Sequence, residues 1–541
     1  MKRSIACVLF LFLAFGTGFA AGKTETASAQ SRKVTISMNI LNTSLDYEKD
    51  DVYRFVKEKF NVDFKFYQYS SSDWKEKVQI WIASGDMPKA MAWDFKAYDM
   101  PQYTQWVKQG AIRALPTDLG KYPNVKNNIL DKMTTDDLLT VDGKRYALPR
   151  IRDYYYLPGE ELEYVWEAGH MMYRRDWAKK LGLYKPNDVY TWDEAMAMAK
   201  AFMQKDPGNN GAGKTIGYGM VDWGLGQGFA GVVQNYPDYV GYREGYFKVN
   251  GKYEWSAGQP GMIDGIKAFR KIADDGTLWK DQPIAKGNAA LDRYYAGEVG
   301  LCMQYWNIGR VMGARQKMIA VLGLNVEQAR DATALMHIQM KNGSLFALPV
   351  EDYWSVLVFS PKMDDVEMDR FLQVANWSAS TEGCLSVKYG PKGKGWDYVG
   401  NTPKALLAVN PGTRAFIYPD SIVAGWGTFL PITSDDSILN GRLEVARQEL
   451  KVYEDTDAFS NLYKGNLKGN KPFDNYTRFF SGPNFNKYGN FASDVNAKVL
   501  EIVYGGKVPA DRIEKAWTDW VASKMPQVQL VLDELNAGIK K

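Results

Sequence analysis

Histidine and cysteine are scarce in this chain of 541 residues, and neither sign of charge dominates. The only two histidines, His170 and His337, are too few for the histidine-based zinc sites and Ser-His-Asp triads of many hydrolases. The chain has 67 Lys and Arg residues against 63 Asp and Glu residues and no concentrated basic block, so a nucleic-acid partner is not indicated. Apolar residues make up 45% and charged residues 24%, as in an ordinary globular protein, and the length is enough for two or three domains.

The first twenty residues have the pattern of an export signal. Lys2-Arg3 precedes an apolar run over residues 5–15, and small residues follow. We predict a signal peptide over residues 1–20; cleavage after Ala29 and retention as an anchor helix are the alternatives. Residues 21–32 are small and polar, as in a tether. No later apolar run reaches the about 20 residues that span a bilayer, which predicts a soluble mature protein.

The three cysteines fit export without a disulfide framework. Cys7 lies within the predicted signal, which leaves Cys302 and Cys384 in the mature chain. We expect both to be buried free thiols, because free cysteine behaves as a small apolar residue; a Cys302–Cys384 disulfide is the alternative. Since no cysteine follows the apolar run of the signal, lipid anchoring is not indicated, which favours a protein that diffuses freely in the periplasm of a two-membrane bacterium.

Strand-like and helical patterns alternate over the first hundred residues. Residues 34–40 alternate like a strand, residues 51–60 have helical spacing and residues 62–66 alternate again, which predicts a parallel βαβ unit. A helix from Asp73 and a strand ending at Trp93 extend this into an open α/β sheet. Ligands of such sheets bind beyond the carboxyl ends of the strands. Four residues near those ends become candidate ligand contacts: Asn39, Asn42, Trp93 and Asp94.

A second region begins near residue 151, and the C-terminal third is mainly helical. Thr191 and Glu194 have the spacing of a helix capping box. Two runs resemble strands, and four have helical spacing. The strand-like runs are 299–306 and 354–359, and the helical ones are 262–274, 366–380, 436–454 and 493–536.

Aromatic residues are abundant, with 17 Trp, 33 Tyr and 24 Phe. Saccharides present apolar C–H faces and many hydroxyl groups, so their sites combine flat aromatic rings with a few polar side chains. Several such side chains lie at strand ends or beside loop-forming residues, although each could instead fill a core. Arg150 could pair with a uronate carboxylate or bridge two lobes. The candidate contacts added in this way are Arg150, Tyr154, Tyr155, Trp223, Trp306, Asn307, Trp354 and Trp426.

Six segments follow one another along the chain: WIASGDMP (81–88), QGAIRAL (109–115), DGKRYALP (142–149), RDWAKKLGL (175–183), AGEVG to WN (296–307) and STEG (380–383). In residues and in order they resemble segments of family 1 extracellular solute-binding proteins, the receptors of ATP-driven (ABC) sugar importers. The chain resembles this family from about residue 34 onward, and its length resembles the branch that binds oligosaccharides.

The resemblance implies an α/β, type II periplasmic-binding-protein fold: two lobes, each a central sheet flanked by helices, with the ligand between them. It implies that lobe 1 comprises residues 33–150 and 346–400, and lobe 2 residues 151–345 and 401–541. It also implies a monomeric receptor that closes on an oligosaccharide, delivers it to the transmembrane subunits of an ABC permease and catalyses no reaction. The sugar, neutral or uronic, stays open.

One segment departs from the family pattern. Many long members have a calcium loop resembling DPDGNGxxD, and here residues 206–214 read DPGNNGAGK. Asp206 and Asn210 remain, but Gly208 and Lys214 replace oxygen ligands that calcium would need. We therefore expect a plain Gly/Asn turn, without calcium or another cofactor.

Two other functions compete with an importer receptor. A secreted glycoside hydrolase would also be rich in aromatic residues and needs only a pair of carboxylates. An outer-membrane glycan-capture protein of the helical-repeat type would share the size, but the sequence shows neither helical repeats nor a lipid-bearing cysteine. Saccharide binding without turnover would favour the receptor over the hydrolase.

Overall fold

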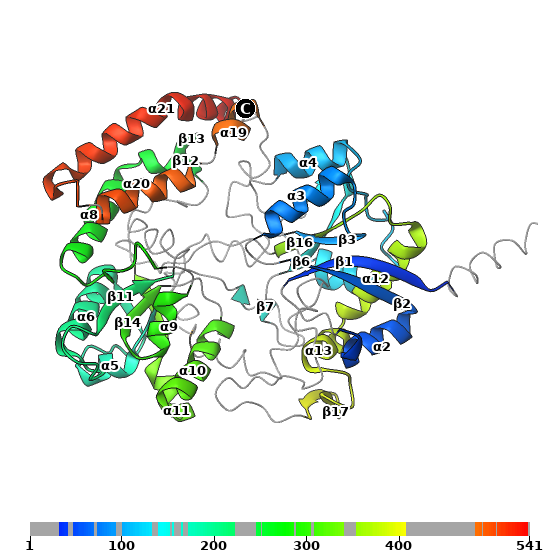
Figure 1. Cartoon of the computed structure of the whole chain (residues 1–541), viewed down its shortest axis with the longest axis horizontal. Helices are drawn as coiled ribbons and strands as arrows, with labels where there is room; N and C mark the ends of the chain where they lie inside the picture. Colours follow the sequence, from blue (N-terminus) through cyan, green and yellow to red (C-terminus); the bar gives the residue numbers. More distant parts are fainter. Residues whose placement is uncertain are drawn as a thin grey trace, which may run out of the picture.

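Two halves, each built on one five-stranded sheet, make up the described part of the chain (Figure 1). The computed structural model describes residues 32–41, 47–69, 73–93, 100–131, 139–151, 154–155, 164–165, 171–221, 245–249, 251–285, 288–303, 308–339, 353–406, 449, 482–489, 491–504 and 506–538.

The first sheet has the strand order β2-β1-β3-β16-β6. β1 and β2 are parallel over their whole length, which confirms the predicted pairing, and Val34, Ile36 and Met38 alternate into the core. β16 lies between β3 and β6 and runs antiparallel to both. The strands are β1 (Val34–Leu41), β2 (Val62–Tyr69), β3 (Ala90–Trp93), β6 (Ala147–Ile151) and β16 (Tyr353–Phe359).

Helices cover both faces of the first sheet (Figure 1). The Asp50 side chain accepts a hydrogen bond from the Tyr53 amide (2.8 Å) at the start of the first helix, and Asn61 ends that helix in the left-handed conformation. The core of this half joins residues 34–148 with residues 356–387. The helices are α2 (Asp51–Phe60), α3 (Trp74–Ser84), α4 (Met100–Lys108), α12 (Asp365–Ser378) and α13 (Thr381–Tyr389), and small hairpins pair β4 (Thr140–Val141) with β5 (Lys144–Arg145) and β17 (Trp396–Val399) with β18 (Thr402–Ala405).

The second sheet has the strand order β10-β15-β9-β14-β11, in which β9 alone runs antiparallel to its neighbours. Thr191 and Glu194 form the predicted capping box at the start of α6. The strands are β9 (Met171–Tyr173), β10 (Val189–Thr191), β11 (Ile216–Met220), β14 (Val299–Met303) and β15 (Ala334–Gln339), with a hairpin of β12 (Tyr246–Val249) and β13 (Lys252–Trp255). The helices are α5 (Arg175–Lys180), α6 (Trp192–Lys205), α8 (Pro260–Asp274), α9 (Ala289–Tyr295), α10 (Ile308–Leu322) and α11 (Val326–Ala332).

The C-terminal helices α19 (Pro483–Tyr488), α20 (Ala492–Tyr504) and α21 (Ile513–Ala537) pack on this second half. The helical pattern predicted over 493–536 is therefore two helices. Gly506, with φ of 62°, and Pro509 lie between them and interrupt the regular structure. The pattern predicted over 436–454 lies outside the described residues, apart from Glu449.

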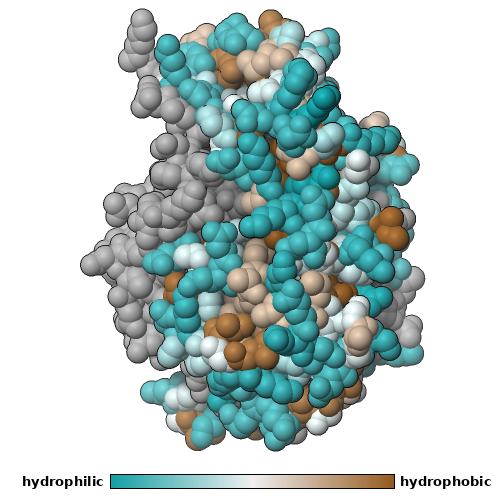
Figure 2. Space-filling view, turned by 90° about the vertical axis from the view of Figure 1, so that its left-hand side faces the viewer, coloured by the Kyte–Doolittle hydropathy of each residue, from teal (hydrophilic) through white to brown (hydrophobic). Residues whose placement is uncertain are grey.

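Both cysteines of the predicted mature chain are buried and free, as predicted: Cys302 lies in β14 and Cys384 in α13. The face of the second half seen in Figure 2 is mainly hydrophilic, with apolar residues in small patches. None of the helices within the described ranges is long and apolar enough to cross a membrane.

Candidate functional site

The carboxyl ends of β1, β3 and β6 meet the amino end of β16 at one edge of the first sheet. The register shows this, because Trp93 at the end of β3 pairs with Val356, and Ile151 at the end of β6 pairs with Tyr353. Of the predicted ligand contacts, Asn39, Trp93, Arg150 and Trp354 lie in the strands at this edge. The fold therefore brings together at this edge residues that lie more than 200 positions apart in the sequence.

Asn39 is buried in β1 and bonds within the sheet. Its amide nitrogen donates to the Ala92 carbonyl (2.9 Å), and its amide oxygen accepts from the Ala92 amide (2.6 Å). The side chain is 1% exposed. Both bonds hold β3 beside β1, so we give Asn39 a structural role and do not carry it into the proposed site.

Trp93 is also buried, with 3% of its surface exposed. Its ring lies 4.5 Å from that of Trp106 and 6.4 Å from that of Tyr103, as measured between centroids. Both neighbours belong to the same core. A ring enclosed in this way offers no free face to a sugar, and we therefore assign Trp93 to the core as well.

Arg150 lies opposite Ser355 in the sheet and is 3% exposed. The two uses considered from the sequence, uronate pairing and lobe bridging, both stay proposals.

The second sheet repeats the arrangement of strand ends. Met220 at the end of β11 pairs with Met303 at the end of β14, and Met303 pairs with Met171 at the start of β9. Trp223 and Trp306 each follow one of these neighbouring strand ends by three residues. The chain therefore leaves the edge of this sheet just before two of the predicted aromatic contacts.

The remaining predicted contacts are described only in part. Tyr154 and Tyr155 form the short strand β7 (Tyr154–Tyr155), which pairs with β8 (Tyr164–Val165). The positions Asn42, Asp94, Trp223, Trp306, Asn307 and Trp426 lie outside the described residues.

Known proteins resemble this chain in sequence and in fold. No family model matches the chain. Among curated proteins, the lipoprotein LipO of Bacillus subtilis is 26% identical over 278 residues, which are 49% of this chain and 51% of LipO. The polygalacturonan/rhamnogalacturonan-binding protein YtcQ of the same organism is 22% identical over 300 residues, 54% of this chain and 55% of YtcQ. The chain thus spans about half the length of the curated relatives it matches.

Solved structures match almost the whole chain. The alginate-binding protein AlgQ2, solved without calcium ion, has a TM-score of 0.65 at 15% identity, covering 94% of this chain and 98% of AlgQ2. The ABC-transporter substrate-binding protein FusA of Streptococcus pneumoniae, in complex with kestose, has a TM-score of 0.63 at 18% identity, covering 93% and 98%. An HMO-binding solute-binding protein from Bifidobacterium longum infantis has a TM-score of 0.62 at 17% identity, also covering 93% and 98%.

The chain has the two-lobe solute-binding fold. This confirms the predicted fold class.

The segment predicted to be a former calcium loop closes on itself in this solute-binding fold. The Asp206 carboxylate accepts hydrogen bonds from the amides of Asn210 (3.0 Å) and Gly211 (2.8 Å) and from the Thr215 hydroxyl (2.5 Å). The Thr215 hydroxyl and these amides hold the pKa of Asp206 below its usual value. The Asn210 side chain donates to the Gly297 carbonyl (2.9 Å). Protein donors therefore bind the oxygens that would otherwise face a cation.

A lysine lies at the same loop. The Lys180 ammonium donates to the Pro207 carbonyl (2.7 Å), which places a positive charge beside the turn. Across the described ranges, no group of three or more His, Cys, Asp and Glu side chains could hold a metal ion.

Sequence reasoning missed Gln282, which lies at the edge of the second sheet. Its side chain accepts from the Met220 amide (2.8 Å) and donates to the Met220 carbonyl (2.6 Å). Met220 is the last residue of β11, so Gln282 fixes a strand end as Asn39 does in the first half. No periodic or motif signal surrounds Gln282, because its role depends on a contact 62 residues away.

Proposed function

We propose that this chain is the receptor of an ABC importer for an oligosaccharide, which it binds between its two lobes and releases chemically unchanged. The two-lobe fold supports the proposal. The relative YtcQ is described as a polygalacturonan/rhamnogalacturonan-binding protein, and the similar solved structures are described with alginate, kestose and HMO. It includes an exported location and transfer of the sugar to the transmembrane subunits of a permease.

The observation that carries the proposal is the pair of sheet edges. In each half, parallel strands end side by side, and the chain at or just beyond those ends contains Trp354, Trp223 and Trp306. Aromatic rings at these positions would stack on the apolar faces of sugar rings, with Asn307 and Arg150 as polar partners. These residues, with Asn42, Asp94, Tyr154, Tyr155 and Trp426, form the proposed contact set.

The proposed mechanism is closure of the lobes without chemistry. A sugar that contacts both lobes binds the closed form more tightly than the open form, so it shifts the population towards closure. The permease would then recognise the closed form.

Calorimetric titration with neutral and uronic oligosaccharides tests this function. We expect saturable binding of a saccharide, and chromatography of the recovered ligand should show no shortened product. Trp306→Ala and Trp354→Ala should each weaken binding by about 1–3 kcal/mol, comparable to the loss of one stacked aromatic contact. Tyr67→Ala is the matched control, since Tyr67 is an exposed aromatic residue of β2.

Two outcomes would contradict the proposal. Binding of amino acids or peptides, but of no saccharide, would refute the ligand class. Release of new reducing ends would support the glycoside hydrolase instead.

A further inference from the structure

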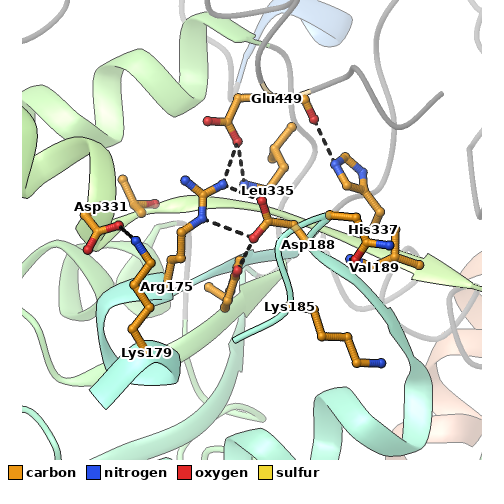
Figure 3. Close-up of polar contacts among 12 residues, drawn as sticks. Arg175, Lys179, Lys185, Asp188, Val189, Asp331, Leu335, His337 and Glu449 are labelled. Carbon is orange, nitrogen blue, oxygen red and sulfur yellow. Dashed lines mark hydrogen bonds and ion pairs between the residues drawn. The ribbon is translucent and has the colours of Figure 1, made fainter. Parts of the chain in front are cut away.

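Glu449 lies in a buried cluster of charged and polar side chains in the second half (Figure 3). It is the one described residue between 407 and 481, and it is 7% exposed. Around it lie residues from α5, α10 and β15, with Asp188 immediately before β10. The contacts that the structure gives for Glu449 are all with residues of the second half.

Two hydrogen bonds and one further ion pair hold the Glu449 carboxylate. The Arg315 guanidinium donates to Oε1 (2.5 Å), and the Leu335 backbone amide donates to Oε2 (3.1 Å). Arg175 approaches Oε2 at 3.7 Å. The carbonyl oxygen of Glu449 lies 2.8 Å from Nε2 of His337, which fixes the backbone as well as the side chain.

The cluster is electrically balanced while His337 is neutral. Two guanidinium groups, Arg175 and Arg315, face two carboxylates, Asp188 and Glu449. Burial alone would raise the pKa of Glu449, but Arg315 and Arg175 outweigh it and hold that pKa below its usual value. Without Glu449, two guanidinium groups and a backbone amide would point at one buried position, and the cluster would carry an excess positive charge. Such a position is suited to binding a carboxylate.

Glu449 lies on the part of the chain that returns from the first half to the second. β18 ends at Ala405 in the first half, and Glu449 is bound against β15 of the second half. The chain has therefore passed from one half to the other between these residues. Two earlier passages lie between β6 and β9 and between β15 and β16.

We propose that Arg175, Arg315 and the Leu335 amide form a carboxylate receptor, filled by Glu449, that fixes where the third connection between the halves returns to the second half. Glu449 is then a positioning residue for the two-lobe arrangement. This last step rests on the proposed function, whereas the carboxylate receptor does not.

Chemical rescue tests the receptor without any sugar. Glu449→Ala should lower the thermal midpoint, and acetate should restore roughly half or more of that loss by occupying the vacated site, whereas acetamide and chloride at equal concentration should not. Val531→Ala is the stability control: it removes volume from the second core, distant in sequence from the cluster, and should gain nothing from acetate beyond the wild type. Equal effects of acetate on all three proteins, or none on Glu449→Ala, would overturn the proposal.

A second pair of variants applies if Glu449→Ala does not fold. Glu449→Gln alone leaves an uncompensated buried charge, whereas Glu449→Gln combined with Arg315→Met restores the balance. We expect the double variant to have the higher thermal midpoint. A lower midpoint than that of Glu449→Gln would contradict a charge-specific receptor.

Saccharide titration then tests the positioning role. At a temperature where both variants are fully folded, Glu449→Gln should bind the sugar at least several-fold more weakly than Val531→Ala does. Equal affinity would refute the positioning role and leave the receptor standing. If the wild type binds no saccharide, the proposed function fails, and acetate rescue still decides the receptor.

Discussion

At the scale of single residues, two buried amide side chains have the same task in the two halves. Asn39 and Gln282 each bond to both polar backbone groups of one strand residue, Ala92 or Met220. A buried backbone N–H or C=O left without a partner is costly, so such an amide is difficult to replace. Both lie near the carboxyl ends of strands, where the sheet must hold its shape to support a site.

Asn39→Leu should therefore destabilise the protein without changing ligand affinity. Loss of both bonds to Ala92 should lower the free energy of unfolding by about 2–4 kcal/mol. Urea unfolding measures this loss, and titration with saccharide at a temperature where the variant is folded measures affinity. A clear loss of affinity in the folded variant would return Asn39 to the site.

His337 makes the stability depend on pH. Burial, partly opposed by Glu449, lowers its pKa to about 4 from an ordinary value of 6.5. Well above pH 6.5 the imidazole is neutral in both the folded and the unfolded state and contributes no pH dependence. As the pH falls from 6.5 to about 4, the unfolded chain binds a proton that the folded protein does not, so stability decreases by up to about 3 kcal/mol.

Urea unfolding between pH 7.5 and pH 4 checks this, with His337→Gln as the comparison. The variant should be less stable at neutral pH but should lose less stability on acidification than the wild type. Equal losses in the two proteins would mean that other groups, rather than His337, set the pH dependence.

At the scale of elements, periodic segments were predictable and contacts distant in sequence were not. Residues 34–40, 51–60 and 62–66 form the predicted strand, helix and strand because their burial repeats every two or every three to four residues. The neighbours of β16 could not be predicted, since β3 and β6 lie more than 200 residues before it. The strand pattern that ends at Trp93 also did not show whether this side chain faces a ligand or packs in the core, where the structure has it.

The loop after α6 gives a prediction at this scale. Because donors from the loop and Thr215 already occupy the Asp206 carboxylate, calcium should have no effect on stability. Thermal unfolding in calcium and in EGTA should give the same midpoint. A rise in calcium that Asp206→Asn abolishes would show that the loop still binds the ion.

At the scale of the whole molecule, the two halves have separate hydrophobic cores. One contains Phe371 and the other Phe269, both fully buried. The first core draws its residues from two separated stretches of chain, 34–148 and 356–387, so this core is discontinuous in sequence. The resemblance to solute-binding proteins led us to expect two discontinuous lobes, and their bounds stay a prediction. The composition of the chain gave no indication of such a division.

Calorimetry should resolve the two cores. Phe371→Ala should lower the stability of the first half and Phe269→Ala that of the second, each by about 3–5 kcal/mol. Without ligand, we expect each variant to shift a different component of the unfolding transition, and a saturating saccharide should bring the components together. One component shifted equally by both variants would show that the halves unfold as one unit.

The central position of β16 has a consequence for biosynthesis. The chain emerges amino end first, and the strands of the second sheet are complete at residue 339, whereas the first sheet waits for residues 353–359. Until then β3 and β6 lack the strand that joins them and present unpaired edges. The sheet that begins first is therefore completed last, and a pause in translation or translocation between residues 151 and 353 would prolong the exposure of its unpaired strands to proteases and aggregation.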